Sequence, residues 1–278
     1  MRLPEWVKVG NKGIHNTKRM LRHYNVESVC EQAKCPNIGI CFAKPTAAFM
    51  ILGKTCTRNC TFCAVSSGIP ESVDLEEPEK IAMAAKDLGL RYVVITSVTR
   101  DDLPDGGAEH FAKTVLAVKK HLPEAKVEVL TPDFNGNKDS IEIVLSSKPD
   151  VFNHNIETVP SLYAKVRPLA DYKSSLGVLA YIKKKNKDIL TKSGLMLGFG
   201  EKIPEVHEVL SDLRKAECDI ITIGQYLRPS KAHLPVVEYI KPEIFESFRL
   251  KALSMGFKYV SSAPLVRSSM NAEEMYNI

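Results

Sequence analysis

The chain has 278 residues, 44% of them hydrophobic, which is enough to bury a sizeable core as one large α/β barrel or two small domains. Its 38 Lys and Arg and 33 Asp and Glu give a net charge of +5, spread along the chain, so no nucleic-acid partner is needed to explain it. No apolar run approaches the roughly 20 residues of a membrane span, and the first residues lack the apolar stretch of a secretory signal.

The cysteines are concentrated toward the amino end of the sequence. Six of the seven fall within residues 30–63, and only Cys218 lies far from them, beside an apolar stretch that is typical of a plain buried thiol. An odd count without a secretion signal argues against disulfides. We therefore expect a cytoplasmic protein with metal-bound thiolates.

The first predicted element is a short amphipathic helix within residues 17–29, and a cysteine triad follows it directly. Cys30, Cys35 and Cys41 have the spacing C-x4-C-x5-C, which is too wide for a zinc knuckle and is not a known disulfide pattern by itself. Since a second triad begins fifteen residues later, we expect the first one to hold a cluster of its own.

The second triad is Cys56, Cys60 and Cys63, at C-x3-C-x2-C spacing after a predicted strand at residues 49–52. Three thiolates on a tight loop can hold three irons of a [4Fe–4S] cube and leave the fourth iron without a protein ligand. An open metal position lets a site do chemistry rather than brace a fold. A zinc knuckle is the alternative, but zinc usually takes two pairs of ligands, and no fourth Cys or His follows at a usual distance.

From residue 48 onward, strand-like and helix-like stretches alternate. Predicted strands lie at residues 49–52, 92–96, 126–130, 151–155, 192–197 and 220–223. Predicted helices lie at residues 78–88, 107–121, 140–146, 172–185 and 203–217. Such alternation predicts parallel strands with right-handed crossovers, and six units suit a partial (β/α)6 barrel. Functional groups should then lie at the carboxyl ends of the strands, where the second triad also falls.

The second triad resembles the signature of the radical S-adenosylmethionine (SAM) enzymes, and the two triads together resemble the lipoyl synthase family. The likeness extends to Cys35-Pro36-Asn37, to the run at residues 48–53 and to later segments, so it covers nearly the whole chain. It implies a radical SAM partial barrel at residues 48–240. An N-terminal helical and loop extension at residues 1–47 would carry the first triad, and a C-terminal extension would occupy residues 241–278.

The resemblance also implies two [4Fe–4S] clusters and a SAM site. The core cluster would be held by Cys56, Cys60 and Cys63, and the auxiliary cluster by Cys30, Cys35 and Cys41. Polar residues that end the predicted strands, together with an aromatic beside the core triad, would contact SAM. These candidates are Phe62, Thr96, Ser97, Asn153, Asn155, Glu157 and Arg167. A polar barrel loop for Thr96 and Ser97, and a surface salt bridge for Arg167, are the plainer alternatives.

The tail contains Arg267-Ser268-Ser269, which matches the start of the family motif Arg-Ser-Ser-Tyr. In the family the second serine, here Ser269, ligates the auxiliary cluster. This chain has Met270 where Tyr is usual, which puts the aromatic packing beside the ligand in doubt. A serine oxygen is a hard donor beside soft thiolates and should be the easiest ligand to lose, which suits a cluster that is taken apart.

The implied activity is sulfur insertion at C6 and C8 of an octanoyl chain on a lysine of a carrier protein. A 5′-deoxyadenosyl radical from SAM would remove each hydrogen, and the auxiliary cluster would supply the sulfur. One alternative is a biotin-synthase-like sulfur insertion on a free small molecule. That family shares the core triad and the Asn153-His154-Asn155 pattern, but the first triad and the serine tail argue against it. Another alternative is a non-catalytic two-cluster electron carrier, which would need neither an open iron nor a barrel.

The implied partners follow from this activity. They are an octanoylated lipoyl carrier domain or H-protein, an electron donor of the flavodoxin or ferredoxin type, and an iron–sulfur carrier for cluster repair. No nucleic acid and no membrane are expected as partners.

Overall fold

The computed structural model describes residues 3–8, 15–43 and 47–276, and the chain divides into two compact units. Unit 1 comprises Met1–Lys8, Asn59–Ala64 and Asn153–Ile278, and unit 2 comprises Val9–Arg58 and Val65–Phe152. The division falls inside strand β7 (Val151–Asn153) and within the core cysteine loop. The predicted division into residues 1–47, 48–240 and 241–278 was based on the expected role of each segment and not on compact units, and it stays a prediction.

Unit 2 is built on strands in the order β1-β2-β5-β6-β7. The first four are β1 (Glu27–Ser28), β2 (Ala48–Ile51), β5 (Tyr92–Ser97) and β6 (Lys126–Leu130). β1 pairs with β2 antiparallel, whereas β2, β5 and β6 pair in parallel. All four residues of β2 are buried, as a strand covered on both faces requires. A separate parallel pair joins β3 (Thr55–Cys56) to β4 (Ser66–Ser67).

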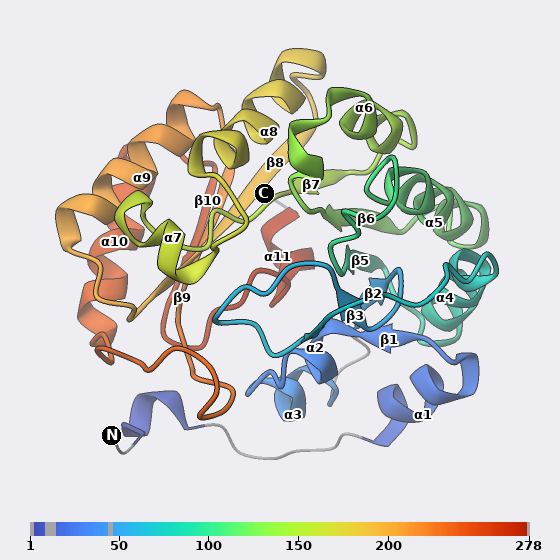
Figure 1. Cartoon of the computed structure of the whole chain (residues 1–278), viewed down its shortest axis with the longest axis horizontal. Helices are drawn as coiled ribbons and strands as arrows, with labels where there is room; N and C mark the ends of the chain where they lie inside the picture. Colours follow the sequence, from blue (N-terminus) through green and yellow to red (C-terminus); the bar gives the residue numbers. More distant parts are fainter. Residues whose placement is uncertain (1–2, 9–14, 44–46, 277–278) are drawn as a thin grey trace. The chain divides into compact units, whose positions relative to one another are not determined.

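The long helices of unit 2 lie on the outer side of its strands (Figure 1). They are α1 (His15–Tyr24), α4 (Glu77–Asp87), α5 (Ala108–His121) and α6 (Lys138–Ser146). The unit also contains three short helices, α2 (Val29–Gln32), α3 (Ile38–Cys41) and η2 (Phe134–Gly136). Local chemistry sets their starts: a proline opens α4, and the Asn137 side chain accepts the backbone N–H groups of Asp139 and Ser140 to begin α6.

The strands of unit 1 have the order β7-β8-β9-β10. Its strands are β8 (Leu190–Leu197), β9 (Ile220–Gln225) and β10 (Tyr259–Ser262), and β8, β9 and β10 pair in parallel. Every residue of β9 is buried. The apolar core of this unit fills the space between β8 and β9 and the helices packed on them, with Phe245 and Phe248 contributing from α10.

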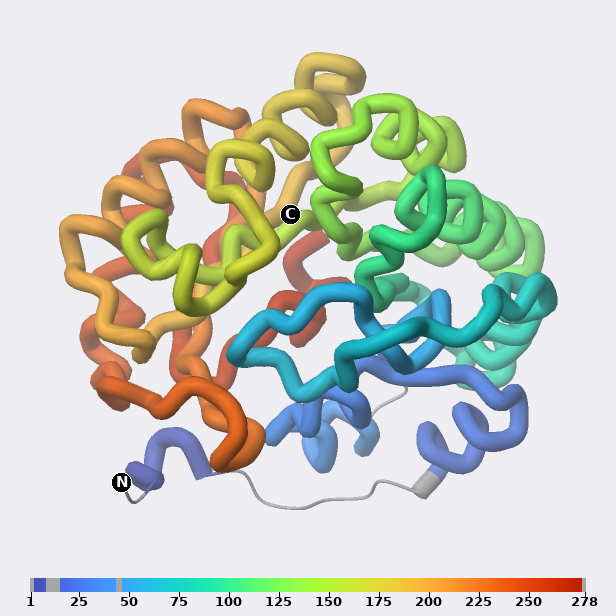
Figure 2. The backbone as a smooth tube through the Cα atoms, viewed as in Figure 1, coloured from blue at the N-terminus to red at the C-terminus, as the bar shows by residue number. Residues whose placement is uncertain are grey.

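Helices α8 (Tyr172–Lys185), α9 (Ile203–Lys215) and α10 (Pro242–Ser254) lie on the outer side of the strands of unit 1 (Figure 1). The other helical segments of this unit are η1 (Glu5–Val7), η3 (Pro160–Leu162), α7 (Tyr163–Val166) and α11 (Ala272–Tyr276). Figure 2 traces the long irregular connection from β9 to α10, residues 226–241, drawn in orange. Asp171 caps α8 by accepting the N–H of Ser174, and prolines open α9 and α10.

All six predicted strands and all five predicted barrel helices are present, most within two residues of the predicted ends. The predicted strand at residues 151–155 is wrong beyond Asn153, because the chain turns there and Glu157 has a φ of +67°. The predicted helix at residues 17–29 is wrong beyond Tyr24, because Asn25 has a φ of +50°.

Several elements were not predicted. They include β1, β10 and α10, and the short α2, α3, β3 and β4 around the cysteines. β10 buries only Val260 fully, so it lacks a continuous apolar run. In the part of the chain that the structure describes, no helix is long and apolar enough to span a membrane.

Candidate functional site

The first half of the core cysteine loop belongs to unit 2. Cys56 ends β3, and its Sγ accepts backbone N–H groups from Arg58 at 3.4 Å and from Thr99 at 3.3 Å. Thr99 follows the carboxyl end of β5, so the sulfur lies where the fold predicts a functional group. Backbone N–H groups that hydrogen-bond a cysteine sulfur are among the contacts that tune iron–sulfur clusters.

A buried ion cluster fixes this half of the loop. The Arg58 side chain, only 3% exposed, donates two hydrogen bonds of 2.7 Å to Asp133 and bonds of 2.8 and 2.9 Å to Asp101. A further bond of 2.7 Å reaches Asn135. Burial alone lowers the pKa of Arg58, but the hydrogen bonds of the two carboxylates outweigh it and raise the pKa above its usual value. The guanidinium therefore stays charged and joins the cysteine loop to the ends of β5 and β6.

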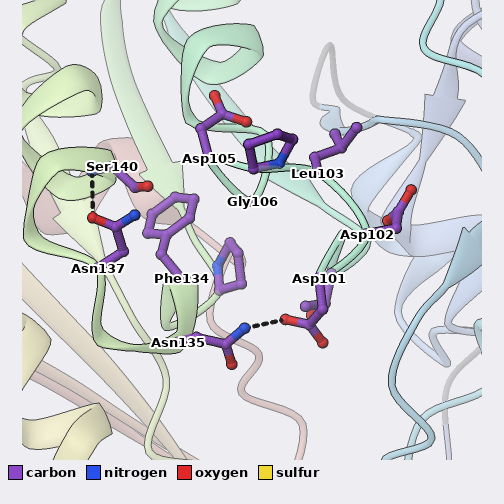
Figure 3. A pocket seen from close by; sticks show the side chains of 12 residues that line it. Asp101, Asp102, Leu103, Asp105, Gly106, Phe134, Asn135, Asn137 and Ser140 are labelled. Atoms are coloured by element: carbon purple, nitrogen blue, oxygen red, sulfur yellow. Dashed lines mark hydrogen bonds between the residues drawn. The ribbon is translucent and has the colours of Figure 1, made fainter.

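Thr57 adds hydrogen bonds beside the ion cluster of Arg58. Its backbone N–H donates to Thr99 O at 3.0 Å, and its hydroxyl lies 3.0 Å from an Asp101 carboxylate oxygen. Asn135 donates to Asp101 at 2.9 Å beside a small polar cavity, shown in Figure 3. The cavity of about 350 Å³ is lined by residues of the loops after β5 and β6. Neither Thr96 nor Ser97 lines it, so it is distinct from the predicted SAM contacts.

The second half of the core loop belongs to unit 1. Thr61 donates its N–H to Val166 O at 3.0 Å and its hydroxyl to Lys165 O at 2.8 Å, both in the last turn of α7. Leu234 N–H donates to Thr61 O at 3.1 Å. His233 lies with Nε2 2.9 Å from Cys63 O, and because a carbonyl only accepts, this nitrogen carries the proton. Cys60 and Cys63 thus sit on a loop held by neutral hydrogen bonds.

Phe62, predicted to contact SAM, packs against a small apolar cluster of unit 1. The cluster contains Val166, Phe199 and Tyr226, and the last two rings stack at a centroid distance of 4.3 Å. Part of the Phe62 side chain remains accessible. The aromatic is therefore fixed on one side and available on the other.

The predicted SAM contacts on β5 differ from each other. The Thr96 hydroxyl donates to Leu130 O at 3.0 Å, so it stabilises the sheet. The Ser97 hydroxyl is buried and has no hydrogen-bond partner among the residues that the structure describes. A buried hydroxyl without a partner is costly, and a ligand group would satisfy it. Ser97 is therefore the better candidate of the two.

The predicted polar group after β7 is brought together within unit 1. Asn155 Nδ2 donates to Glu157 Oε1 at 3.1 Å, and Arg167 Nη1 donates to Asn155 O at 3.1 Å. Arg167 is buried and also donates to the Tyr163 hydroxyl at 3.0 Å, so it serves the interior of the unit. Burial raises the pKa of Glu157, and the nearby Arg167 charge and the Asn155 amide only partly offset this.

The first triad lies on the short helices α2 and α3 of unit 2. Cys30 is in α2, Cys41 ends α3, and Cys35 lies between them, with its N–H donating to Cys30 O at 2.9 Å. Burial, and to a smaller extent the nearness of Cys35 and Cys41, raises the pKa of Cys30 to about 12. A metal would have to displace that proton.

None of the seven cysteines is in a disulfide. Among the described residues, no three His, Cys, Asp or Glu side chains form a ready group of metal ligands. Cys218 is fully buried and hydrogen-bonds backbone carbonyls, as predicted for a plain thiol.

The tail after β10 packs on β9. Ala263 N–H of the tail donates to Ile223 O of β9 at 3.1 Å, and Gln225 N–H of β9 donates to Pro264 O of the tail at 3.1 Å. Gly224 makes the approach possible, because a Cβ there would lie 2.2 Å from Val266 O. Ser268, Ser269 and Met270 form the next turn. Within unit 1 the Ser268 hydroxyl contacts both Asn153 and Asn155.

Sequence reasoning missed several residues of this site. Arg58, Asp101 and Asp133 carry the ion cluster, and His233 and Ser268 hold the loop and the polar group. A signal existed for Arg58, since an arginine between two metal-binding cysteines needs acidic partners when it is buried. No local pattern pointed to His233 or Ser268, because their partners lie far away in the sequence.

Known proteins resemble this chain over most of its length. Residues 50–213 match the model of the Radical SAM superfamily. A lipoyl synthase of Caldicellulosiruptor saccharolyticus is 55% identical, covering 99% of this chain and 98% of the relative. A lipoyl synthase of Caldanaerobacter subterraneus is 54% identical, covering 98% and 96%.

Among solved structures, methylornithine synthase aligns with a TM-score of 0.55 at 14% identity, over 93% of this chain and 84% of that one. At this identity the likeness concerns the fold alone. Together with the family match, it confirms the predicted fold class, a radical SAM α/β fold with a partial barrel of parallel strands.

We predict that Arg58→Met will destabilise the protein by about 3–5 kcal/mol, because it leaves the buried Asp133 carboxylate without its partner. Arg249→Met is the matched control, since Arg249 pairs with Glu246 on the surface of α10 and should change stability by less than about 1 kcal/mol. Urea unfolding followed by circular dichroism measures both. Equal losses in the two variants would contradict a structural role for the ion cluster.

Proposed function

Because the chain belongs to the lipoyl synthase family of the radical SAM superfamily, we propose that it inserts two sulfur atoms into an octanoyl chain carried on a lysine of a lipoyl carrier protein. The positions are C6 and C8 of the chain. The observation that carries this function is the 55% sequence identity with a lipoyl synthase over nearly the full length of both proteins.

The cofactors of this family are SAM and two [4Fe–4S] clusters. The donor set of this chain fits them: two groups of three cysteines supply soft ligands, and none of the six is in a disulfide. The backbone N–H groups aimed at Cys56 Sγ add the kind of donor that tunes such a cluster. When bound, the cofactors supply radical hydrogen abstraction and sulfur, which no side chain can supply.

Each triad holds one cluster in this proposal. Cys56, Cys60 and Cys63 bind the core cluster and leave one iron for SAM. Cys30, Cys35 and Cys41 bind the auxiliary cluster, with Ser269 as its fourth ligand. The second assignment is supported by the position of the triad on α2, on α3 and on the segment between them, where Cys35 and Cys41 are near enough to raise the pKa of Cys30.

The polar residues after the strands bind SAM in this proposal. Asn155 and Glu157 suit the ribose hydroxyls, since an amide and a carboxylate offer both donors and acceptors. Ser97 offers a buried hydroxyl that needs a partner, and Phe62 offers an aromatic face. Asn153, Arg167 and Thr96 complete the predicted set, with Arg167 and Thr96 also bonded to the backbone of their own unit.

Hydrogen-atom abstraction needs no general acid or base, so the chain's residues bind, orient and exclude water. The alternatives are less well supported. A biotin-synthase-like enzyme would not need the first triad, and an electron carrier would not need the SAM-side residues. Formation of 5′-deoxyadenosine from SAM and dithionite separates an enzyme from a carrier.

The reaction requires a carrier protein substrate and a reductant. We propose an octanoylated lipoyl domain or H-protein as the substrate, a flavodoxin or ferredoxin as the reductant, and an iron–sulfur carrier for repair of the auxiliary cluster. A cytoplasmic location stays a prediction.

Mass spectrometry of an octanoylated carrier peptide tests the function directly. After reaction with the reconstituted chain, SAM and dithionite, we expect two sulfur atoms in place of two hydrogens. A peptide that remains unchanged while SAM is cleaved would refute sulfur insertion on a carrier.

We predict that the two triads are separable. Replacing Cys56, Cys60 and Cys63 by Ala should abolish SAM cleavage and leave about half of the iron, since each triad holds its own cube. Replacing Cys30, Cys35 and Cys41 should end sulfur insertion and leave SAM cleavage intact. Iron analysis and chromatography of 5′-deoxyadenosine measure the two effects. Loss of SAM cleavage in the second variant, with a normal core-cluster spectrum, would contradict this division.

We also predict that Ser269→Cys will hold the auxiliary cluster more tightly and slow sulfur insertion, because thiolate suits iron better than a hydroxyl oxygen. Ser269→Ala should make that cluster labile or incomplete, and SAM cleavage should persist in both variants. Iron content and the rate of product formation measure these effects. A fully active Ser269→Ala variant with both clusters intact would show that Ser269 is not a ligand.

A further inference from the structure

The hydroxyl of Ser268 lies between Asn153, the last residue of β7, and Asn155, which follows the strand. Asn153 Nδ2 donates to Ser268 Oγ at 2.8 Å, and Ser268 Oγ donates to Asn155 Oδ1 at 3.0 Å. More than a hundred residues separate the partners in the sequence, but all three belong to unit 1. The tail therefore contributes a side chain to the polar group after β7.

The donor and the acceptor of each of these hydrogen bonds can be assigned. An amide NH₂ only donates, so Asn153 uses an acceptor position of the hydroxyl and leaves its single proton for Asn155. Since Asn155 receives that proton on its oxygen, its own NH₂ faces Glu157 and donates to Oε1 at 3.1 Å. The sequence of bonds runs from Asn153 through Ser268 and Asn155 to Glu157. Ser268 on the oxygen side and Glu157 on the nitrogen side thus fix together which way the Asn155 amide faces.

Further contacts restrict the conformation of Asn155. Arg167 holds its backbone oxygen at 3.1 Å. On the β8 side, a Cβ at Gly194 would lie 2.7 Å from Asn155 Oδ1, so the amide packs directly on a glycine. With the backbone and one face fixed, the hydroxyl of Ser268 supplies the remaining constraint.

Ser268 is itself held independently of these amides. The tail is anchored on β9 through Pro264 O, which accepts Gln225 N–H at 3.1 Å, and the turn is closed by Met270 N–H donating to Arg267 O at 3.0 Å. The backbone bonds of the tail therefore position the Ser268 hydroxyl, and its position does not depend on the asparagine side chains. Such preorganisation lowers the entropy cost of ligand binding.

We propose that Ser268 is a positioning residue for SAM: it orients the amide of Asn155 and, through it, the carboxylate of Glu157. This inference rests on the proposed function, in which Asn155 and Glu157 bind SAM. It gives the two serines of the tail different roles, with Ser269 serving the auxiliary cluster and Ser268 serving the SAM side.

The test uses the full chain with both clusters reconstituted, and it measures the dissociation constant of SAM by equilibrium dialysis. Ser268→Ala should weaken SAM binding roughly three- to tenfold, the effect of one hydrogen bond, while iron content stays at the wild-type value. Ser268→Thr retains the hydroxyl and should restore most of the affinity. In a double-mutant cycle, Ser268→Ala with Asn155→Ala should bind SAM no more weakly than Asn155→Ala alone, because both act through one amide.

Ser262→Ala is the matched control, since this serine of unit 1 donates to Phe245 O at 2.7 Å, away from β7. Equal weakening in Ser262→Ala and Ser268→Ala would overturn the inference, and so would additive effects in the cycle or the loss of iron from Ser268→Ala. An unchanged affinity in Ser268→Ala, with a weakened Asn155→Ala, would overturn it while leaving the SAM role of Asn155 in place. An unchanged Asn155→Ala would remove both, although the two-sulfur test of the overall function would be unaffected.

Discussion

The buried cation of Arg58, shared by two carboxylates, is the interaction on which the start of the core loop depends. A charge with 3% of its side chain exposed is tolerated only with complete pairing, and Asp101, Asp133 and Asn135 provide five bonds to it. Three elements must be in register for these bonds to form: β3, the end of β5 and the end of β6. The carboxyl end of the unit 2 sheet is therefore specified by electrostatics as well as by apolar packing.

The two halves of the core loop are held by different chemistry. Cys56 lies beside a charged cluster, whereas the segment of Cys60 and Cys63 is fixed by neutral backbone bonds, by His233 and by the packing of Phe62. Both ends of the loop are therefore held, one by buried charge pairs and the other by neutral hydrogen bonds and apolar packing.

Much of the fold could be predicted from sequence because each barrel strand is a short apolar run that differs from the helices around it. β9 is the clearest case, since all of its residues are buried. β10 was missed because Val260 is its only fully buried residue, and α2 and α3 because four-residue helices have no measurable period. The cysteines and the Asn155 and Glu157 pair were predicted as site residues from cysteine spacing and from the ends of the predicted strands. Ser268 and Arg58 were not, since their roles come from partners that only the fold brings near.

Gly224 gives the tail an unusual genetic sensitivity. Its missing side chain leaves room for the carbonyl of Val266, which a Cβ would approach to 2.2 Å. A point change in the middle of a buried strand would therefore displace a segment forty residues downstream, without touching any ligand. Such a variant would have the phenotype of a truncated chain although every residue of the tail is still encoded. In inherited or selected variants, a substitution at Gly224 should be grouped with deletions of the tail rather than with ordinary core mutations.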